Sequence, residues 1–128
     1  MGVGSVRLVV VLDCVDADAL AGFWVAALGY RRTPFGRPYV RLFDPAKRWP
    51  DLLLQQVPEP KRGKNRMHLD LQVLDVHAEV ERLVSAGAVV VEPAHDDGGF
   101  LTVVLTDPQG NEFCVLRPPA GDEGLQEI

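Results

Sequence analysis

The chain has 128 residues and a mass of 14.0 kDa, with 47% hydrophobic and 24% charged residues, which suits one soluble globular domain. Its net charge is −5, and its only cationic cluster lies in one short segment, so the composition argues against a nucleic-acid partner. The apolar runs are far shorter than the roughly 20 residues that a membrane-spanning helix needs, and the start lacks a signal-peptide pattern. We therefore expect no membrane partner and a cytoplasmic protein whose two cysteines, Cys14 and Cys114, are reduced.

The first half of the sequence predicts one strand, one helix and about three further strands. Residues 6–15 form a nearly continuous β-branched apolar run, which is typical of a strand covered on much of both faces. Asp16 occupies the position of an N-cap, and an apolar stripe with spacings of three and four continues as far as Gly29, so we predict a helix between them. Alternation in residues 37–43 and an apolar run in residues 52–57 predict two more strands.

A second set of the same signals follows residues 58–66, whose prolines and cationic side chains are typical of a solvated linker. The next strand, RMHLDLQVLD, occupies residues 66–75, and Asp75 caps a helix that ends at Gly87. The remaining predicted segments are strands at residues 88–92, 100–106 and 112–117, a loop at 95–99, a turn at 107–111 and a frayed tail at 119–128.

The two halves of the sequence repeat one plan. Aligning His68 with Val9 also makes the two N-cap residues, Asp75 and Asp16, coincide. In both halves a strand leads into a capped amphipathic helix that ends at a glycine. We therefore predict an α+β fold with two tandem βαβββ modules, the first at about residues 5–57 and the second at about residues 67–118.

Three motifs carry a resemblance to a known superfamily: DCVDADALAGFWVAALGY at residues 13–30, LLLQQVPEPKRGKNRMHLDL at 52–71 and DPQGNEFCV at 107–115. With the tandem βαβββ plan, they resemble the vicinal oxygen chelate superfamily of glyoxalases, bleomycin-resistance proteins and extradiol dioxygenases, and within it the small glyoxalase-like proteins. The resemblance implies a curved mixed sheet around a groove, a small organic ligand in that groove between the modules, and a homodimer.

The resemblance also implies metal ligands on the first and last strands of the modules. The first-strand position of the second module is His68, which matches the superfamily, whereas that of the first module is Val9, which cannot coordinate a metal. The last-strand position of the second module, usually Glu, is Cys114, and its counterpart falls near Leu54 or Gln56. This donor set suits a glyoxalase-type metal poorly, so we expect no cofactor; a divalent metal, if present, would use His68 and Cys114.

The polar face of the strand at residues 66–75 presents His68, Asp70 and Gln72. His68 is the best candidate for an acid or base near neutral pH. Asp13 projects from the equivalent strand of the first module. Both carboxylates either contact a ligand or cap backbone groups at the floor of the groove.

Along the last predicted strand, Glu112 and Cys114 alternate with Phe113 and Val115, so we expect both to face the groove. Beside His68, Cys114 is either a thiolate nucleophile or an unreactive, partly buried thiol. Other side chains that suit an aromatic or anionic ligand, or the groove in general, are Tyr39, Arg41, Trp49, Gln56 and Phe100.

The leading interpretation is a metal-free protein that binds a small organic molecule. It either sequesters that molecule or acts as a lyase or isomerase with His68 in proton transfer. The first alternative is a glyoxalase- or dioxygenase-like enzyme with His68 and Cys114 in a divalent-metal site. The second alternative is an interaction module with no ligand.

Overall fold

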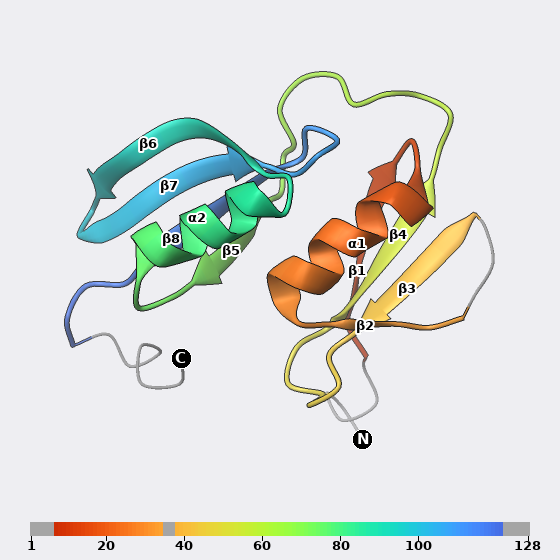
Figure 1. Cartoon of the computed structure of the whole chain (residues 1–128), viewed down its shortest axis with the longest axis horizontal. Coiled ribbons are helices and arrows are strands. Elements are labelled where there is room, and N and C mark those ends of the chain that lie inside the picture. Colours follow the sequence, from red (N-terminus) through yellow and green to blue (C-terminus); the bar gives the residue numbers. More distant parts are fainter. Residues whose placement is uncertain (1–6, 35–37, 122–128) are drawn as a thin grey trace. The chain divides into compact units, whose positions relative to one another are not determined.

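The computed structural model describes residues 7–34 and 38–121. The chain forms two compact units, Met1–Pro60 and Lys61–Ile128, and the boundary falls inside the predicted linker at residues 58–66. Each unit contains a strand, a helix and three further strands in that order, as Figure 1 shows. The predicted α+β architecture of two βαβββ modules is therefore confirmed.

The first module is a four-stranded sheet with one helix. Its elements are β1 (Val9–Cys14), α1 (Ala17–Leu28), β2 (Arg31–Arg32), β3 (Tyr39–Phe43) and β4 (Asp51–Gln56). The strand order is β1-β4-β3-β2, with β1 parallel to β4 and the other neighbours antiparallel. The outer ends of the strands predicted at 6–15 and 37–43 extend into residues 1–6 and 35–37, outside the described ranges.

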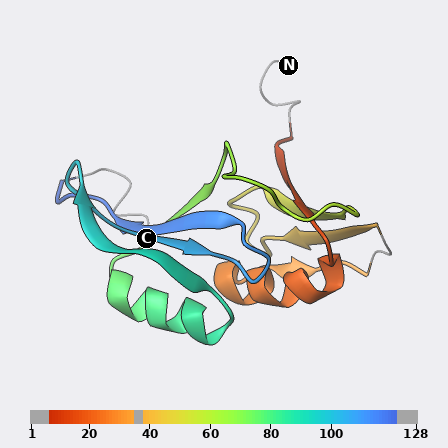
Figure 2. The same ribbon diagram turned by 90° about the horizontal axis from the view of Figure 1, so that it is seen from above.

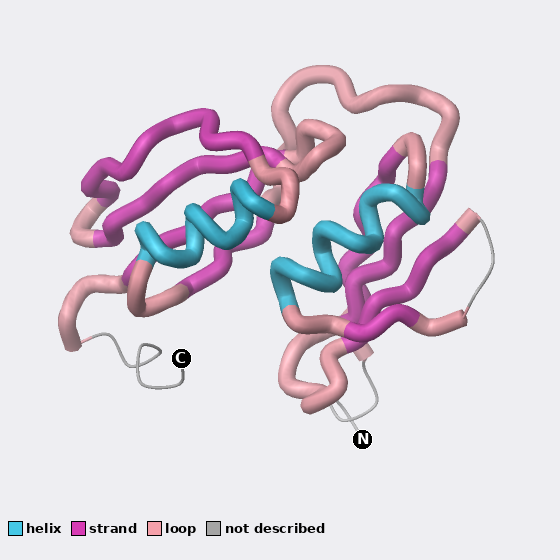
Figure 3. Tube along the Cα trace, viewed as in Figure 1, coloured by secondary structure: helices cyan, strands magenta, loops and turns pink. Residues whose placement is uncertain are grey.

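The second module has the same topology. Its elements are β5 (Leu69–Gln72), α2 (Val76–Ser85), β6 (Val89–Asp97), β7 (Phe100–Thr106) and β8 (Glu112–Arg117). The strand order is β5-β8-β7-β6, with β5 parallel to β8. Figure 3 shows the same succession of strand, helix and strands along both halves of the chain.

Strand pairing confirms the repeat. Counted back from the helix caps, Val10 and Leu69 hold matching positions on the first strands. Val10 lies opposite Leu52 in the first module, as Leu69 lies opposite Phe113 in the second. The predicted alignment of the first strands is therefore correct, and His68 is equivalent to Val9.

The residue equivalent to Cys114 is Leu53, because the chain between the first and last strands is slightly longer in the second module than in the first. Cys114 lies opposite Asp70, and Leu53 occupies the matching position on β4. The counterpart expected near Leu54 or Gln56 is thus one residue from Leu54, whose own side chain is buried in the core.

Local capping sets the helix limits. The side chain of Asp16 accepts a hydrogen bond from the N–H of Ala19, and Gly29 ends α1 at a left-handed φ of 69°. Asp75 caps α2 in the same way through the N–H of Ala78. Neither helix in the described part of the chain is long and apolar enough to cross a bilayer.

Each helix covers one face of its own sheet, as Figure 2 shows. The buried side chains include Leu20, Trp24, Val40, Leu42, Leu52 and Leu54 in the first module and Leu83, Val103, Leu105, Phe113 and Val115 in the second. We call the face opposite the helix the open face. On β1 the open face carries Val9 and Val11, both exposed, so the expectation that this strand is covered on much of both faces fails for the open face.

Strand β6 is longer than predicted. It has nine residues and includes part of the segment at 95–99 that the sequence assigns to a loop. Its pairing with β7 shifts register between Val90 and His95, which breaks the alternation that would reveal a strand. The hairpin then turns at Gly98 and Gly99, whose positive φ values of 60° and 94° suit glycine.

Candidate functional site

Three side chains with ligating atoms meet on the open face of the second module. Asp70 and Gln72 alternate with the core-facing residues of β5, and His68 lies two residues before Asp70. Cys114 lies opposite Asp70 in the parallel pair of β5 and β8. The ligating atoms of His68, Asp70 and Cys114 all lie within 4.8 Å of one another. The structure thus brings together three of the predicted site residues.

Asp70 holds the imidazole of His68. Nε2 of His68 lies 3.0 Å from Oδ1 of Asp70, and the two side chains are 41% and 48% exposed. A carboxylate at this distance orients the ring and leaves Nδ1 as the nitrogen that can meet a ligand. The exposure of both groups allows a small molecule to reach them.

Cys114 is half-buried, and its environment keeps the thiol protonated at neutral pH. Burial raises the pKa of the Cys114 thiol, and the negative charges of Asp70 and Glu92 raise it further. A nucleophilic cysteine needs a lowered pKa. The geometry therefore favours the unreactive thiol over the thiolate nucleophile.

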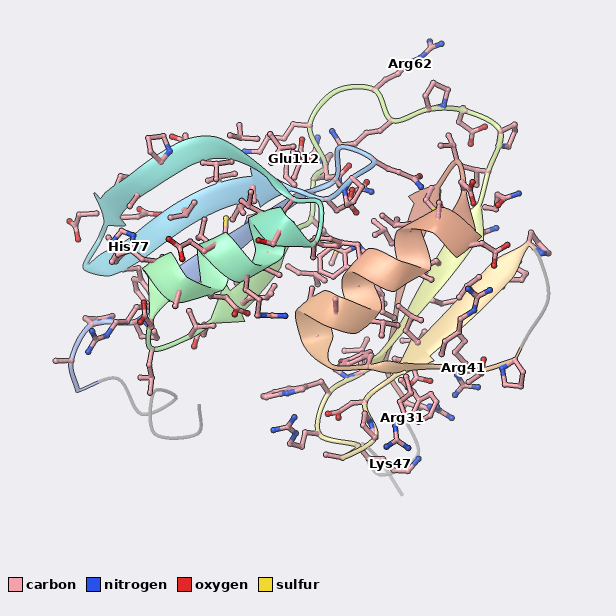
Figure 4. All side chains as sticks on the ribbon, in the orientation of Figure 1. Arg31, Arg41, Lys47, Arg62, His77 and Glu112 are labelled. Atoms are coloured by element: carbon pink, nitrogen blue, oxygen red, sulfur yellow. The ribbon has the colours of Figure 1, made fainter. Side chains whose placement is uncertain are left out.

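Glu112 is already engaged by neighbouring groups. Its carboxylate accepts a hydrogen bond from Nζ of Lys61 at 2.8 Å and another from the N–H of Asn65 at 3.0 Å. Figure 4 shows Glu112 beside the segment that precedes β5. Glu112 thus fixes the chain that leads into His68, and part of the predicted solvated linker packs against β8.

The other residues predicted to contact a ligand lie elsewhere in the fold. Asp13 and Tyr39 lie on the open face of the first module and are exposed. Phe100 begins β7 and is half-buried. Gln56 points to the helix side, where its side-chain oxygen accepts a hydrogen bond at 3.1 Å from the N–H of Ala17. Its amide therefore supports the start of α1 rather than the open face.

Among the residues that the structure describes, one group of donors fits a divalent metal, and it lies within the second module. Zinc accepts nitrogen, oxygen and sulfur ligands, and catalytic zinc sites use three of them with one position left open. His68, Asp70 and Cys114 supply one of each. The equivalent positions of the first module include Val9 and Leu53, which cannot coordinate a metal. The metal site expected from the sequence has only two ligands, His68 and Cys114, and Asp70 supplies a third. Asp70 lies two residues after His68 and so faces the same side of the strand, which is the sequence signal that could have identified it.

The first module contains a separate pocket of about 480 Å³. Its walls come from the segment before β1, from β3 and from the loop between β3 and β4. Arg41 and Trp49, two of its lining residues, are among the side chains that the sequence suggests for an aromatic or anionic ligand. Arg7 and Lys47 also line the pocket. The sequence signal for Arg7 is that it lies two residues before Val9, so the alternation of β1 places both side chains on the same face.

The two βαβββ modules define the fold of the vicinal oxygen chelate superfamily, in which each four-stranded sheet carries one helix. The sequence profile of the Glyoxalase-like domain family matches residues 9–116, and the chain belongs to that family. A search of curated proteins found no match.

Solved structures share this fold. An enzyme of the glyoxalase/bleomycin resistance protein/dioxygenase family from Burkholderia phytofirmans PsJN superposes with a TM-score of 0.72 at 18% identity, over 84% of this chain and 94% of that one. A glyoxalase/bleomycin resistance protein/dioxygenase from Alicyclobacillus acidocaldarius gives 0.69 at 15% identity over 98% of both chains. TioX from Micromonospora sp. ML1 gives 0.62 at 21% identity, over 88% of this chain and 98% of that one. At such identities the similarity establishes the fold alone.

Proposed function

We propose that this protein binds a small carbonyl or carboxylate compound on the open face of the second module, with His68 as its main polar contact. The observation that carries the proposal is the 3.0 Å pair between His68 and Asp70, because it presents an oriented imidazole on an accessible sheet surface.

The free cysteines Cys14 and Cys114 fit a reducing compartment, which supports a cytoplasmic location.

The same pair supports a lyase or isomerase that transfers a proton. With Asp70 on Nε2, Nδ1 of His68 can take a proton from the carbon next to a carbonyl group and return it to another atom of the same molecule. A protein that only sequesters its ligand would use the same contact without exchanging the proton. Proton exchange with solvent therefore separates the two possibilities.

Metal-dependent catalysis is a second candidate function, favoured by the convergence of three donor atoms within 4.8 Å. His68, Asp70 and Cys114 would hold the ion. A bound zinc-like ion would supply Lewis-acid polarisation of a carbonyl oxygen. Coordination would also require the Cys114 thiol to lose its proton, against the raised pKa of that group.

Metal analysis of protein purified without a histidine tag separates the two candidates. Stoichiometric zinc, nickel, iron or manganese that is lost in both His68→Ala and Cys114→Ser would support the metal enzyme. Protein that binds its ligand equally well before and after chelator treatment would support the metal-free site.

Calorimetry with pyruvate, which carries both a carbonyl and a carboxylate, tests the contact itself. His68→Gln should weaken binding by about 1–3 kcal/mol, the cost of losing a polar partner, and should leave thermal unfolding nearly unchanged because the side chain is 41% exposed. His77→Gln is the matched control, since His77 is an exposed histidine on α2 of the same module. Unaltered affinity in His68→Gln would refute the proposal. Deuterium exchange into the pyruvate methyl group, lost in the same variant, would identify proton transfer.

A further inference from the structure

We propose that the pocket of the first module binds a small aromatic carboxylate, at a site separate from the His68 cluster. All its lining residues belong to the first module, whereas the cluster belongs to the second. Its volume of about 480 Å³ lies in the range of small-molecule sites, roughly 300–1,000 Å³. The inference does not depend on the function proposed for His68.

Two arginines meet one carboxylate at this pocket. Nη2 of Arg7 and both Nε and Nη2 of Arg41 lie 2.6–2.7 Å from Oδ2 of Asp51. Asp51 holds both guanidinium groups in place but balances only one of their two charges. Each guanidinium has five N–H groups, so the pair retains donors for a second carboxylate, which arginine binds with two parallel hydrogen bonds.

The loop before β4 presents a further cation, Lys47. Asp44 accepts hydrogen bonds of 2.9–3.3 Å from the N–H groups of Ala46, Arg48 and Trp49, which folds the loop tightly. Lys47 lies in this turn with φ at 56°, a left-handed conformation that is rare for a residue with a long side chain. Asp44 is balanced by Arg48, whose Nε lies 3.4 Å away, so the charge of Lys47 is available to the pocket.

The pocket therefore combines positive charge with aromatic surface. The four cations and two carboxylates named above leave a surplus of two positive charges on a chain whose net charge is −5. Figure 4 shows Arg31 at the same end of this module as Arg41 and Lys47, and Arg31 is the register neighbour of Phe43 in the pocket wall. Trp49 is 59% exposed, so its indole offers a face on which a flat ring can stack. A ring that bears a carboxylate matches both features.

The two tryptophans give a direct test. Trp49 lines the pocket, whereas Trp24 is buried in the core, so only one of the two indole N–H signals should respond to a ligand. In a ¹⁵N–¹H correlation spectrum, benzoate should shift the Trp49 signal saturably. Uncharged benzamide and inorganic phosphate should shift it far less, because each lacks one of the two features. Trp49→Phe assigns the signals.

Two variants test the charges. Lys47→Gly removes a cation and suits the left-handed backbone, and Arg7→Gln alters a side chain that is 68% exposed. Each should weaken benzoate binding roughly tenfold, the effect of losing one charge-assisted hydrogen bond, while the Trp24 signal stays in place. Arg62→Gln, which removes an exposed cation of the second module, and His68→Gln should bind benzoate like the parent protein.

Benzamide binding as tightly as benzoate, or an equal saturable response to inorganic phosphate, would overturn the proposal. So would unchanged benzoate affinity in both charge variants. Loss of benzoate binding in His68→Gln would show that the pocket is not a separate site. Failure of pyruvate binding at His68 would refute the function proposed above and leave the benzoate result standing.

Discussion

Replacing Glu112 by Gln should lower the free energy of unfolding by about 1–2 kcal/mol at neutral pH. The side chains of Lys61 and Glu112 are only 20% and 19% exposed and lie 2.8 Å apart. Their pair should therefore contribute more than an exposed ion pair, about 0.2–1 kcal/mol, and less than a buried one, about 3–5 kcal/mol. Gln keeps an acceptor for the N–H of Asn65, but it puts an NH2 group in place of the oxygen that Lys61 contacts, so the charge and that one hydrogen bond are lost.

Urea unfolding of the parent, Glu112→Gln, Lys61→Met and the double variant yields the coupling energy of this pair. We expect about 1–2 kcal/mol at pH near 7. The matched control is the pair of Glu79 and Arg82 on α2, three residues apart, whose carboxylate is as shielded as that of Glu112 but whose arginine is 46% exposed. This pair should couple by about 0.5 kcal/mol or less. A coupling energy for Lys61 and Glu112 no larger than that of the control would refute the reasoning.

The same pair predicts a pH dependence. Burial alone would raise the pKa of Glu112, but the hydrogen bonds from Lys61 and Asn65 outweigh it and hold the pKa below its ordinary value of 4.5. Because the folded pKa is lower than the unfolded one, the stabilisation is complete above the ordinary value and is lost as the pH falls through the folded pKa. The stability difference between parent and Glu112→Gln should therefore shrink as the pH is lowered below the ordinary value of 4.5; a constant difference over that range would contradict this assignment.

Two further predictions concern the thiol and the assembly. Asp70→Asn should speed alkylation of Cys114 by iodoacetamide severalfold near pH 7.5, because burial still raises the pKa of the thiol but the added effect of the Asp70 charge is gone. Mass spectrometry separates Cys114 from the buried Cys14, and an unchanged Cys114 rate would count against the assigned cause. We also expect light scattering to return the mass of a homodimer, twice that of one chain, and a mass of one chain across a wide concentration range would exclude it.

Features set by neighbouring residues were predictable from the sequence. Both helix starts rest on an aspartate that caps its own first turn, Asp16 or Asp75, and the end of α1 rests on Gly29. The period of two along a strand correctly places His68 and Asp70 on one face, away from the core. These signals need no knowledge of the partner strand.

Features set by pairing between strands were not predictable. The chain between the first and last strands differs in length between the modules, so an alignment that fits the first strands could not fix the register of Gln56 on β4. The irregular pairing near Pro93 hid the true length of β6. The pocket needs the Asp44 turn to bring Lys47 toward Arg7, and nothing in the spacing of these residues reveals that fold.

The two modules place different side chains at equivalent backbone positions. At the centre of the open face, Val11 lies opposite Leu53 in the first module, and Asp70 lies opposite Cys114 in the second. Proton transfer and metal binding both need donor atoms that converge on one point, and in the described part of the chain such a group, His68 with Asp70 and Cys114, lies in the second module. In the first module Arg7 and Arg41 instead gather around Asp51 at the strand ends, and the proposed anion site rests on this arrangement. The fold is thus the same in both halves, and the residues at equivalent positions decide which kind of site each half supports.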